Sequence, residues 1–424
     1  MGDILFNKIQ NNGVKLMDLA KKTAFFMVYY SIIAIPFFMA INQAPTNVFM
    51  GILLSGFLLK KLLDRESFFP RLSINLPLAI FFLLTCVSIL HSVSIKDTLR
   101  GGILRLLEYI LVLYAVYYSV QDKKHLSRII LSFCAGIILT CANEFWQVYS
   151  GKDFIRGTDV ILNIGLLRAT SSFGDANTLG IYLSALVPAV LGGAFFYHKG
   201  LKRVSLVIVS ILGVLGIALT YSRPTLLAIY VVLWFFAIAR KNKKLIIFLA
   251  VFTVLAPLML PLSVKKWAKE VDYNPLRFMC NDDRVTIYKR SIEMIKDHPV
   301  IGFGANTYMK DYKGYKYTVP AYRGVETIDY IYAHNNFLHM AVEVGLAGLA
   351  VFLWFIFAVF KEAKSTFSCL KDDYLKVICL SLTACVIAFL VNGLTESSLY
   401  YARVALIFWY LCGLLLSLRR ISCA

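Results

Sequence analysis

Two short polar segments carry arginines of the kind that bind phosphate groups, and each borders a long apolar block. The first segment, 168–177, begins with Arg168, contains a Phe-Gly pair and ends at Asn177. The second is a turn in which Ser222 and Arg223 precede a proline. A guanidinium group stays charged and can hold phosphate oxygens through two parallel hydrogen bonds. Solvation alone does not explain these residue types, so both segments are candidate functional sites, with Arg223, at the tip of a tight turn, the stronger candidate.

A longer polar segment predicts a surface helix followed by a glycine loop. Apolar residues between 282 and 297 follow helical spacing, and Arg284 adds a charge near the start. The helix is expected to end at His298, because a proline follows and stops it. Gly302 and Gly304 then form a flexible loop whose backbone N–H groups could approach a ligand. Arg284 and His298 are therefore further candidate functional residues.

The next apolar block opens with Ala-His-Asn-Asn, which supplies candidate groups for proton transfer and sugar binding. His334 is a candidate of this kind, because the imidazole of a histidine is the side chain best suited to act as a general base at a hydroxyl group. Asn335 and Asn336 can orient the imidazole or a sugar. Glu343 falls about two turns into the apolar block, where an ionisable group is costly and is a functional candidate by default.

Each of these residues also has a purely structural interpretation, which the sequence leaves open. An arginine at a membrane face can reach to lipid headgroups. His298 can cap helix carbonyls, and His334 can lie at the membrane interface. Glu343 can be a buried, hydrogen-bonded acid that holds helices together. Arg105 and Glu108, one helical turn apart in an earlier block, are expected to form a structural ion pair.

The elements that must position these residues are transmembrane helices. Of the 424 residues, 59% are hydrophobic. They come in blocks of about 18 to 25, the length that crosses ~30 Å of hydrocarbon as a helix, and they lack the alternation of barrel strands. We predict an all-α polytopic membrane protein with about twelve spans, near residues 23–41, 46–60, 75–95, 101–120, 127–149, 178–197, 203–220, 224–240, 244–262, 336–360, 374–392 and 399–418.

The basic residues predict how the chain crosses the membrane. Loops on one side carry clusters of lysine and arginine, whereas the short loops 42–45, 96–100, 221–223 and 393–403 together hold four basic residues. By the positive-inside rule, both termini are expected in the cytoplasm and the candidate residues on the outer face.

The chain is expected to be one integral membrane unit in three stretches. Residues 1–262 would hold helices 1–9, residues 263–335 a large outer loop with short helices, and residues 336–424 helices 10–12. The net charge of +19 sits in clusters between spans, so we expect membrane lipid headgroups rather than nucleic acid as its partner. The nine cysteines show no metal-ligand spacing, so neither a metal nor a cofactor is expected.

Taken together and in this order, the motifs resemble those of the O-antigen ligase and polymerase superfamily of GT-C type glycosyltransferases. The matching stretches are 168–177, 220–224, 284–304 and 334–348. They read as Arg with Phe-Gly and Asn before a span, a Ser-Arg turn, an Arg-led helix ending in His-Pro and Gly-x-Gly, and His-Asn followed by Glu-x-Gly-x-x-Gly. One departure is Ala176, where the family usually has proline.

The resemblance implies a glycosyltransferase of a bacterial inner membrane with a periplasmic active site. Such enzymes transfer a glycan from undecaprenyl pyrophosphate, and in ligases the acceptor is a sugar hydroxyl of lipid A-core. By position, His334 matches the base, and Arg223 and Arg284 match the residues that hold the leaving diphosphate. The reaction would be inverting and metal-independent. Substrate would also contact the other motif residues: Arg168, Asn177, Ser222, His298, Gly302, Gly304, Asn335, Asn336 and Glu343.

Other functions stay open at this point. A polymerase, which extends a lipid-linked glycan, shares the same motifs, although the His-Asn motif and the single large late loop favour a ligase. A transporter or flippase would need charged groups or broken helices near the middle of the bilayer. A receptor would be expected to carry a soluble domain. The spans are nearly free of charge and the polar residues gather on one face, so we expect an enzyme and not a transporter.

Overall fold

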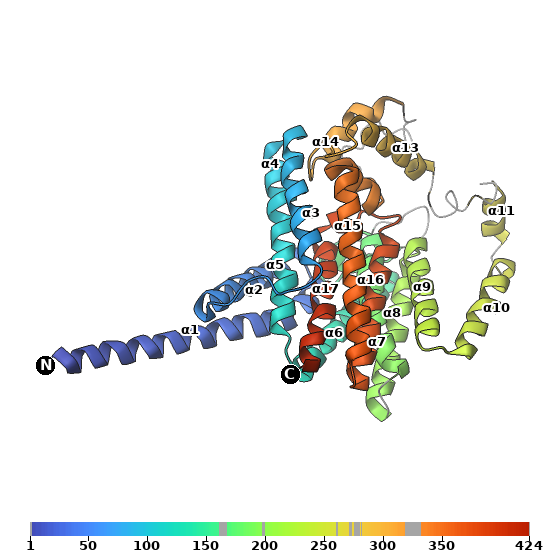
Figure 1. Cartoon of the computed structure of the whole chain (residues 1–424). Coiled ribbons are helices and arrows are strands. Elements are labelled where there is room, and N and C mark those ends of the chain that lie inside the picture. The colour runs from blue at the N-terminus through green and yellow to red at the C-terminus, as the bar shows by residue number, and fades with distance from the viewer. Residues whose placement is uncertain are drawn as a thin grey trace.

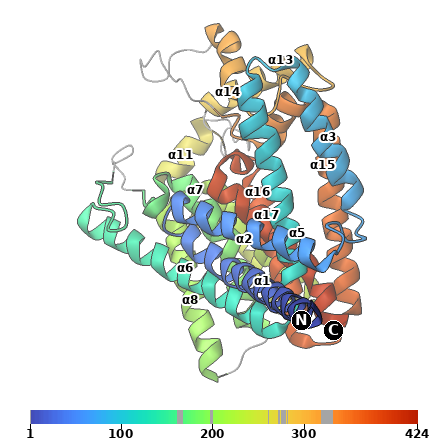
Figure 2. The same ribbon diagram turned by 90° about the vertical axis from the view of Figure 1, so that its left-hand side faces the viewer.

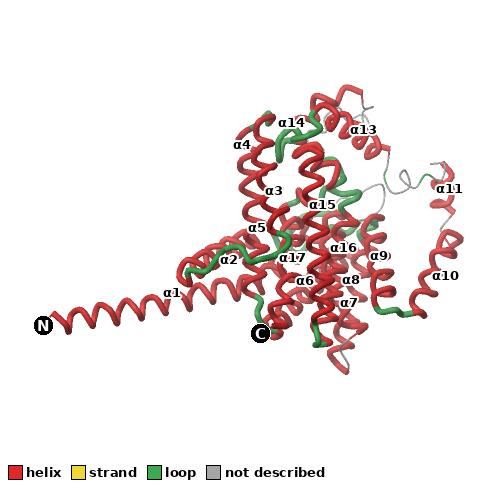
Figure 3. The backbone as a smooth tube through the Cα atoms, viewed as in Figure 1, coloured by secondary structure: helices red, strands yellow, loops and turns green. Residues whose placement is uncertain are grey.

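The computed structural model describes residues 2–160, 168–196, 200–259, 262–270, 274, 280, 282–318 and 332–423. Figures 1 and 3 show a bundle of helices joined by short loops. Each of the twelve predicted spans overlaps a helix, because long apolar blocks satisfy their backbone groups internally in this conformation.

The helices before the large loop are α1 (Gly2–Met39), α2 (Gln43–Asp64), α3 (Asn75–Val87), η1 (Ser88–His91), α4 (Ile95–Asp97), the π-helical η2 (Thr98–Leu104), α5 (Arg105–Ser119), α6 (Lys123–Ser150), η3 (Ser171–Phe173), α7 (Ala176–Phe196), α8 (Gly200–Leu219), α9 (Arg223–Ala239) and α10 (Lys243–Met259). The later ones are α11 (Leu262–Glu270), α13 (Asp282–Asp297), α14 (Tyr308–Asp311), η4 (Tyr312–Thr318), α15 (Asn336–Cys369), α16 (Asp373–Asn392), η6 (Ser398–Tyr400) and α17 (Ala402–Cys423).

Eight helices within the described residues are long and apolar enough to cross a membrane. They are α1 from residue 15 onward, α2, α6, α7, α8, α15, α16 and α17, and two shorter apolar helices cover 75–91 and 223–239. The prediction of a polytopic helical membrane protein is therefore confirmed. The count of twelve spans, the GT-C architecture and the division at residues 262 and 335 stay predictions.

Local sequence explains where several helices begin and end. The side chains of Asp122, Asn335 and Asp372 accept hydrogen bonds from the first backbone N–H groups of α6, α15 and α16. Pro224 lies in the first turn of α9, where a missing N–H costs nothing. The surface helix predicted for 282–297 is α13, which ends at Asp297, two residues before Pro299.

The centre of the bundle is formed by α7, α16 and α17. Helix α7 packs against α16 and α8, α16 packs against α9, and α17 packs against α5. Helices α1 and α2 form a hairpin whose first part extends away from the bundle (Figure 1). In both ribbon views α13 and α14 lie at the opposite end from the C-terminus, and we call this the loop end (Figures 1 and 2).

Helix α15 is interrupted near the loop end. Gly345 has φ 77° and ψ 175°, outside the helical region, and this frees carbonyl groups of the preceding turn. Their hydrogen bonds come from the glycine loop: the N–H of Phe303 donates to the carbonyl of Val342 at 2.9 Å, and that of Gly304 to the carbonyl of Glu343 at 2.9 Å. The loop backbone thus fills the break in the helix.

Candidate active site

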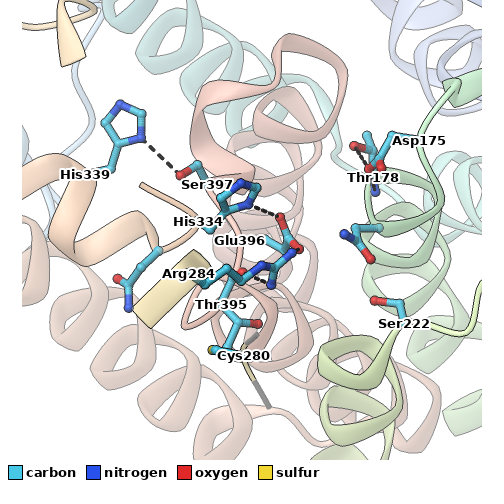
Figure 4. Close-up of polar contacts among 12 residues, drawn as sticks. Asp175, Thr178, Ser222, Cys280, Arg284, His334, His339, Thr395, Glu396 and Ser397 are labelled. Carbon is cyan, nitrogen blue, oxygen red and sulfur yellow. Dashed lines mark hydrogen bonds and ion pairs between the residues drawn. The ribbon is translucent and has the colours of Figure 1, made fainter. Parts of the chain in front are cut away.

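A buried carboxylate joins two of the predicted site residues at the loop end. Oε1 of Glu396 lies 2.5 Å from Nη2 of Arg284, and Oε2 lies 3.2 Å from Nδ1 of His334 (Figure 4). Arg284 belongs to α13, His334 precedes α15, and Glu396 lies between α16 and η6. Arg284 also donates from Nη1 to the carbonyl of Thr395 at 2.8 Å. Three elements far apart in the chain therefore meet at one carboxylate.

The charges in this cluster support one another. Burial acts to raise the pKa of Glu396, but the hydrogen bond from His334 and the charge of Arg284 outweigh it, so the pKa lies below its ordinary value. Burial acts to lower the pKa of Arg284, and the charge and hydrogen bond of Glu396 reverse this and raise it. Glu396 is therefore ionised at neutral pH despite an exposed fraction of 2%.

This carboxylate selects the tautomer of His334. An ionised carboxylate only accepts hydrogen bonds, so Nδ1 of the imidazole must carry the proton that faces it. The neutral ring then keeps its lone pair on Nε2, which is the form that can take a proton from a hydroxyl group. A base whose ring is oriented by a carboxylate is a recurring arrangement in enzymes that activate hydroxyl nucleophiles.

The backbone of His334 is fixed by its neighbours. The residue has φ 48°, in the left-handed region that non-glycine residues seldom adopt. The hydroxyl of Tyr288, on α13, donates to its carbonyl at 2.9 Å. Asn335 caps α15, and its side-chain amide donates to the carbonyl of Leu394 at 2.8 Å. These contacts hold the imidazole above the start of α15.

Asn336 joins the same two segments from inside the protein. It is 1% exposed, its Nδ2 donates to Oγ of Ser398 at 2.7 Å, and its Oδ1 accepts from the N–H of Leu399 at 2.9 Å. In the structure Asn335 and Asn336 therefore tie α15 to the loop that carries Glu396. We therefore assign Asn335 and Asn336 the role of positioning His334 and Glu396, and not of contacting substrate directly.

The first two predicted segments also meet. Nε of Arg168 donates to the carbonyl of Thr220 at 2.9 Å, and its Nη2 donates to Oδ1 of Asn177 at 2.8 Å. Asn177 lies in the first turn of α7, and Asp175 accepts from the N–H of Thr178 there at 2.7 Å. Arg168 thus fixes the turn between α8 and α9 against the start of α7.

Arg223 stands at the tip of that turn and is the first residue of α9. Partial burial is the largest cause that lowers its pKa, and the positive charges of Arg284 and Arg168 lower it further. Arg284 and Arg168 therefore both lie close enough to Arg223 to act on it electrostatically. The sequence predicted each of them separately, and the structure brings them together.

Ser222 faces the interior of the bundle. It is 2% exposed, and its Oγ accepts from Oγ1 of Thr225 at 3.0 Å. Thr225 also contacts Oδ1 of Asn392 at 3.1 Å, and Nδ2 of Asn392 donates to Oγ of Ser184 at 2.9 Å. These contacts join α9, α16 and α7, so we assign Ser222 a role in holding the Arg223 turn.

The glycine loop differs from the prediction. The N–H of Gly302 donates to the carbonyl of His298 at 3.2 Å, and the N–H of Gly304 donates to the broken turn of α15. A Cβ at Gly302 would lie 2.5 Å from the Glu343 backbone, so glycine at this position permits the loop backbone to approach the α15 backbone closely. The loop's N–H groups are used within the protein, and we leave Gly302 and Gly304 out of the substrate-binding set.

His298 lies in a cluster of rings beside this loop. Its ring centroid is 4.7 Å from that of His91 and 4.4 Å from that of Phe303. Nδ1 of His91 lies 3.1 Å from the carbonyl oxygen of Gly302. These contacts favour the structural interpretation of His298 over a role as the base.

Glu343 belongs to a second buried cluster. Its Oε1 accepts from the N–H of Tyr308 at 3.1 Å and lies 3.2 Å from Nε2 of His339. Nδ1 of His339 lies 3.1 Å from Oγ of Ser397, the residue after Glu396 (Figure 4). Glu343 is 2% exposed, as its structural interpretation requires, and it reaches the Glu396 loop through one histidine.

The sequence did not single out Glu396 or His339. Glu396 was visible as an acid in the short 393–403 loop, but it had no partner at a meaningful spacing. The expected pairing of Arg105 with Glu108 is present, with Nη1 and Oε2 2.9 Å apart.

The fold and the cluster together define a class of protein. It is a multi-pass helical membrane protein with a charged cluster at its loop end. Residues 208–353 match the family model Wzy_C, described as O-antigen ligase. The matched segment contains Arg223, Arg284 and His334, whereas Glu396 lies beyond it. A comparison with curated proteins gave no match.

Proposed function

We propose that the protein is a glycosyltransferase that moves a glycan from undecaprenyl pyrophosphate to a sugar hydroxyl of lipid A-core, as an O-antigen ligase. The observation that carries this proposal is the cluster of Arg284, Glu396 and His334. Arg223 lies close enough to it for the charge of Arg284 to lower the pKa of Arg223. Such a site offers a base for a hydroxyl group beside cations for a leaving diphosphate. The family match supports lipid-linked glycans as the substrate class.

His334 is the proposed base. Nε2 takes the proton of the acceptor hydroxyl while its oxygen attacks the anomeric carbon of the donor glycan. The bond between that carbon and the phosphate oxygen breaks, and undecaprenyl diphosphate leaves with the bonding electrons. A single displacement inverts the anomeric configuration. General-base catalysis of this kind is worth roughly 10²–10⁴-fold in rate.

Arg223 is the proposed main ligand of the diphosphate. Arg223 stands at the tip of a turn that Arg168 holds in place, close enough to Arg284 for the two charges to interact. A donor aimed at charge that develops in the transition state contributes roughly 10²–10³-fold to the rate. Arg284 would also attract the diphosphate, although Glu396 offsets much of its positive charge. It would keep Glu396 in position for His334 as well.

The proposed location is a bacterial inner membrane, with the loop end in the periplasm and both termini in the cytoplasm. The undecaprenyl chain would lie among the apolar helices, since its diphosphate must reach the charged cluster at the loop end. Membrane lipids would surround the remaining helix faces.

Reconstitution with purified components tests the function. The protein in liposomes receives lipid-linked glycan and, in separate reactions, lipid A-core or a second lipid-linked glycan. Glycan on lipid A-core supports the ligase, whereas a longer glycan on the lipid carrier shows the polymerase. Release of neither product, with glycan moved across the bilayer, would replace the proposal with a transporter.

The same assay tests the metal-independent mechanism. Chelation of divalent cations should leave the rate of transfer unchanged, because arginines supply the positive charge in the proposed site. A rate that falls on chelation and returns with magnesium would contradict this part of the proposal.

A further inference from the structure

A cavity of about 270 Å³ borders the loop that carries Glu396, through Leu399, Tyr400 and Ala402. Its lining comes from α3, η2, α5, α15, η6 and α17, and includes Arg105, Tyr109, Glu343, Tyr400 and Trp409. Small-molecule sites usually measure about 300–1,000 Å³, so this volume suits a single compact ring. We call it the α5–α17 pocket.

The chemistry of the pocket favours a neutral ligand rich in hydroxyl groups. Glu108 pairs with Arg105 at 2.9 Å and offsets its charge, and Glu343 adds carboxyl oxygens to the lining. A phosphate would therefore find little net positive charge there. Aromatic rings supply flat apolar walls: Tyr109 and Trp409 stack with centroids 6.3 Å apart. Sugar rings present hydroxyls for the polar groups and C–H faces for such walls.

The pocket is covered at the loop end. Nδ2 of Asn306 donates to the carbonyl of Asp97 at 3.4 Å, and Lys310 forms an ion pair with Asp97. The N–H of Ala305 donates to Oγ of Ser88 at 3.1 Å. These contacts fasten the segment before α14 across α4 and η1, above the pocket.

The face of α5 beside the pocket is exposed. The side chains of Arg105 and Glu108 are 37% and 41% exposed, and Leu104 and Leu107 beside them are exposed as well. A charged pair among exposed apolar residues of a membrane protein is costly and marks a functional surface by default. A ligand would therefore approach from the bilayer, which requires a membrane anchor.

The pocket communicates with the proposed active site through His339. This ring stacks on Tyr400 at 3.5 Å, contacts Glu343 at 3.2 Å and contacts Ser397 at 3.1 Å. Ser397 follows Glu396, so the pocket wall contacts the same short loop that carries the carboxylate beside His334. A transferase that joins two membrane-anchored molecules needs two such approaches.

We propose that the α5–α17 pocket binds a sugar residue of the membrane-anchored acceptor glycan. This inference rests on the proposed function, because it assigns the second substrate of the same reaction. The donor approaches the arginines, and the acceptor approaches between α5 and α17.

Direct binding tests the pocket without any assay of transfer. Replacing Trp146, Trp234, Trp267 and Trp354 by Phe leaves Trp409 as the sole tryptophan. Core oligosaccharide released from lipopolysaccharide by mild acid should change its fluorescence in a saturable manner. Ala402→Phe should abolish this change, because Ala402 lines the pocket, whereas Leu62→Phe on the exposed face of α2 should not. No saturable change in the protein without pocket substitutions would overturn the proposal.

Transfer kinetics provide the second measurement. Ala402→Phe should raise the KM for lipid A-core by about tenfold or more, as expected for a lost contact of this size, with the KM for the donor within about twofold. Leu62→Phe should leave both values unchanged. Equal rises in both KM values, or none, would contradict an acceptor pocket. Saturable fluorescence without transfer would keep the pocket and reject the proposed function.

Discussion

Oε2 of Glu396 lies 3.2 Å from Nδ1 of His334, although 62 positions separate the two residues in the chain. This contact converts an ordinary histidine into a candidate base with a defined tautomer. It also links the matched family segment to a residue outside it, because 208–353 includes His334 and stops before Glu396. The last short loop of the chain is therefore part of the proposed site.

We expect His334→Gln to lower the rate of transfer by roughly 10²–10⁴-fold, because glutamine cannot accept the hydroxyl proton. Glu396→Gln should also lower it, because an amide can present either an oxygen or an N–H to the ring and no longer selects one tautomer. Initial rates in liposomes measure both effects. The Glu396→Gln and His334→Gln losses should not multiply in the double variant, since the two residues act as a unit. Fully multiplicative losses would show that they act independently.

Arg168→Lys should slow transfer while the protein stays folded. A lysine keeps the charge, but it cannot donate in two fixed directions to the carbonyl of Thr220 and Oδ1 of Asn177. The turn that carries Arg223 would shift, and a misplacement of about 1 Å can cost roughly 10²-fold in rate. Monodisperse elution from a size-exclusion column checks the fold. An Arg168→Lys protein with normal rate would show that the turn needs no such support.

Asp311 predicts a dependence of stability on pH. Burial is the main cause that raises its pKa from 3.8 to about 6, and Glu343 adds to this. Its Oδ2 is buried without a hydrogen-bond partner among the described residues. A raised pKa means that the acid stabilises the fold fully below pH 3.8 and loses this contribution as pH rises through about 6.

Asp311→Asn should therefore stabilise the protein at pH 8 by up to about 3 kcal/mol, which is the linkage value of a shift of about two pKa units. Near pH 4 the variant and the parent should unfold at similar temperatures. Thermal unfolding in detergent at the two pH values measures the difference. A variant that is less stable than the parent at pH 8 would show that the carboxylate has a stabilising partner.

Gly345→Ala should destabilise the protein strongly. Gly345 has φ 77°, and a Cβ there would lie 2.0 Å from the carbonyl oxygen of Val300. The backbone strain alone costs about 1–3 kcal/mol, and the overlap adds to it. Gly51→Ala is the matched control, because a Cβ at Gly51 meets nothing within 4 Å and helix propensity favours alanine. An equal unfolding temperature for both variants would contradict the tight insertion of the glycine loop.

Much of the fold could be predicted because apolar length alone defines a membrane helix. The end of α13 at Asp297 and the ion pair of Arg105 with Glu108 follow from local rules, a proline stop and helical spacing. Membrane span number was harder, since 75–91 and 223–239 are shorter than a typical span. The sequence shows how long each apolar block is, but it does not show where that block lies relative to the bilayer.

The candidate site could be predicted only in part. Arg223, Arg284 and His334 stood in short motifs whose residue types suggested phosphate and proton chemistry. Glu396 did not, because its partners lie 62 and 112 positions away and no local pattern marks it. The sequence suggested that the N–H groups of the glycine loop approach a ligand. In the structure they bond to carbonyls freed at the Gly345 break in α15, and that break depends on tertiary packing.

The filled break in α15 has a consequence for relatives that differ in substrate. Because the backbone of residues 300–304 completes the hydrogen bonding of a membrane helix, the large loop is not an independent module. A chimaera that imports this loop from another protein should fold only when the turn around Gly345 is imported with it. Evolutionary change in the loop would then have to proceed in step with change inside the membrane.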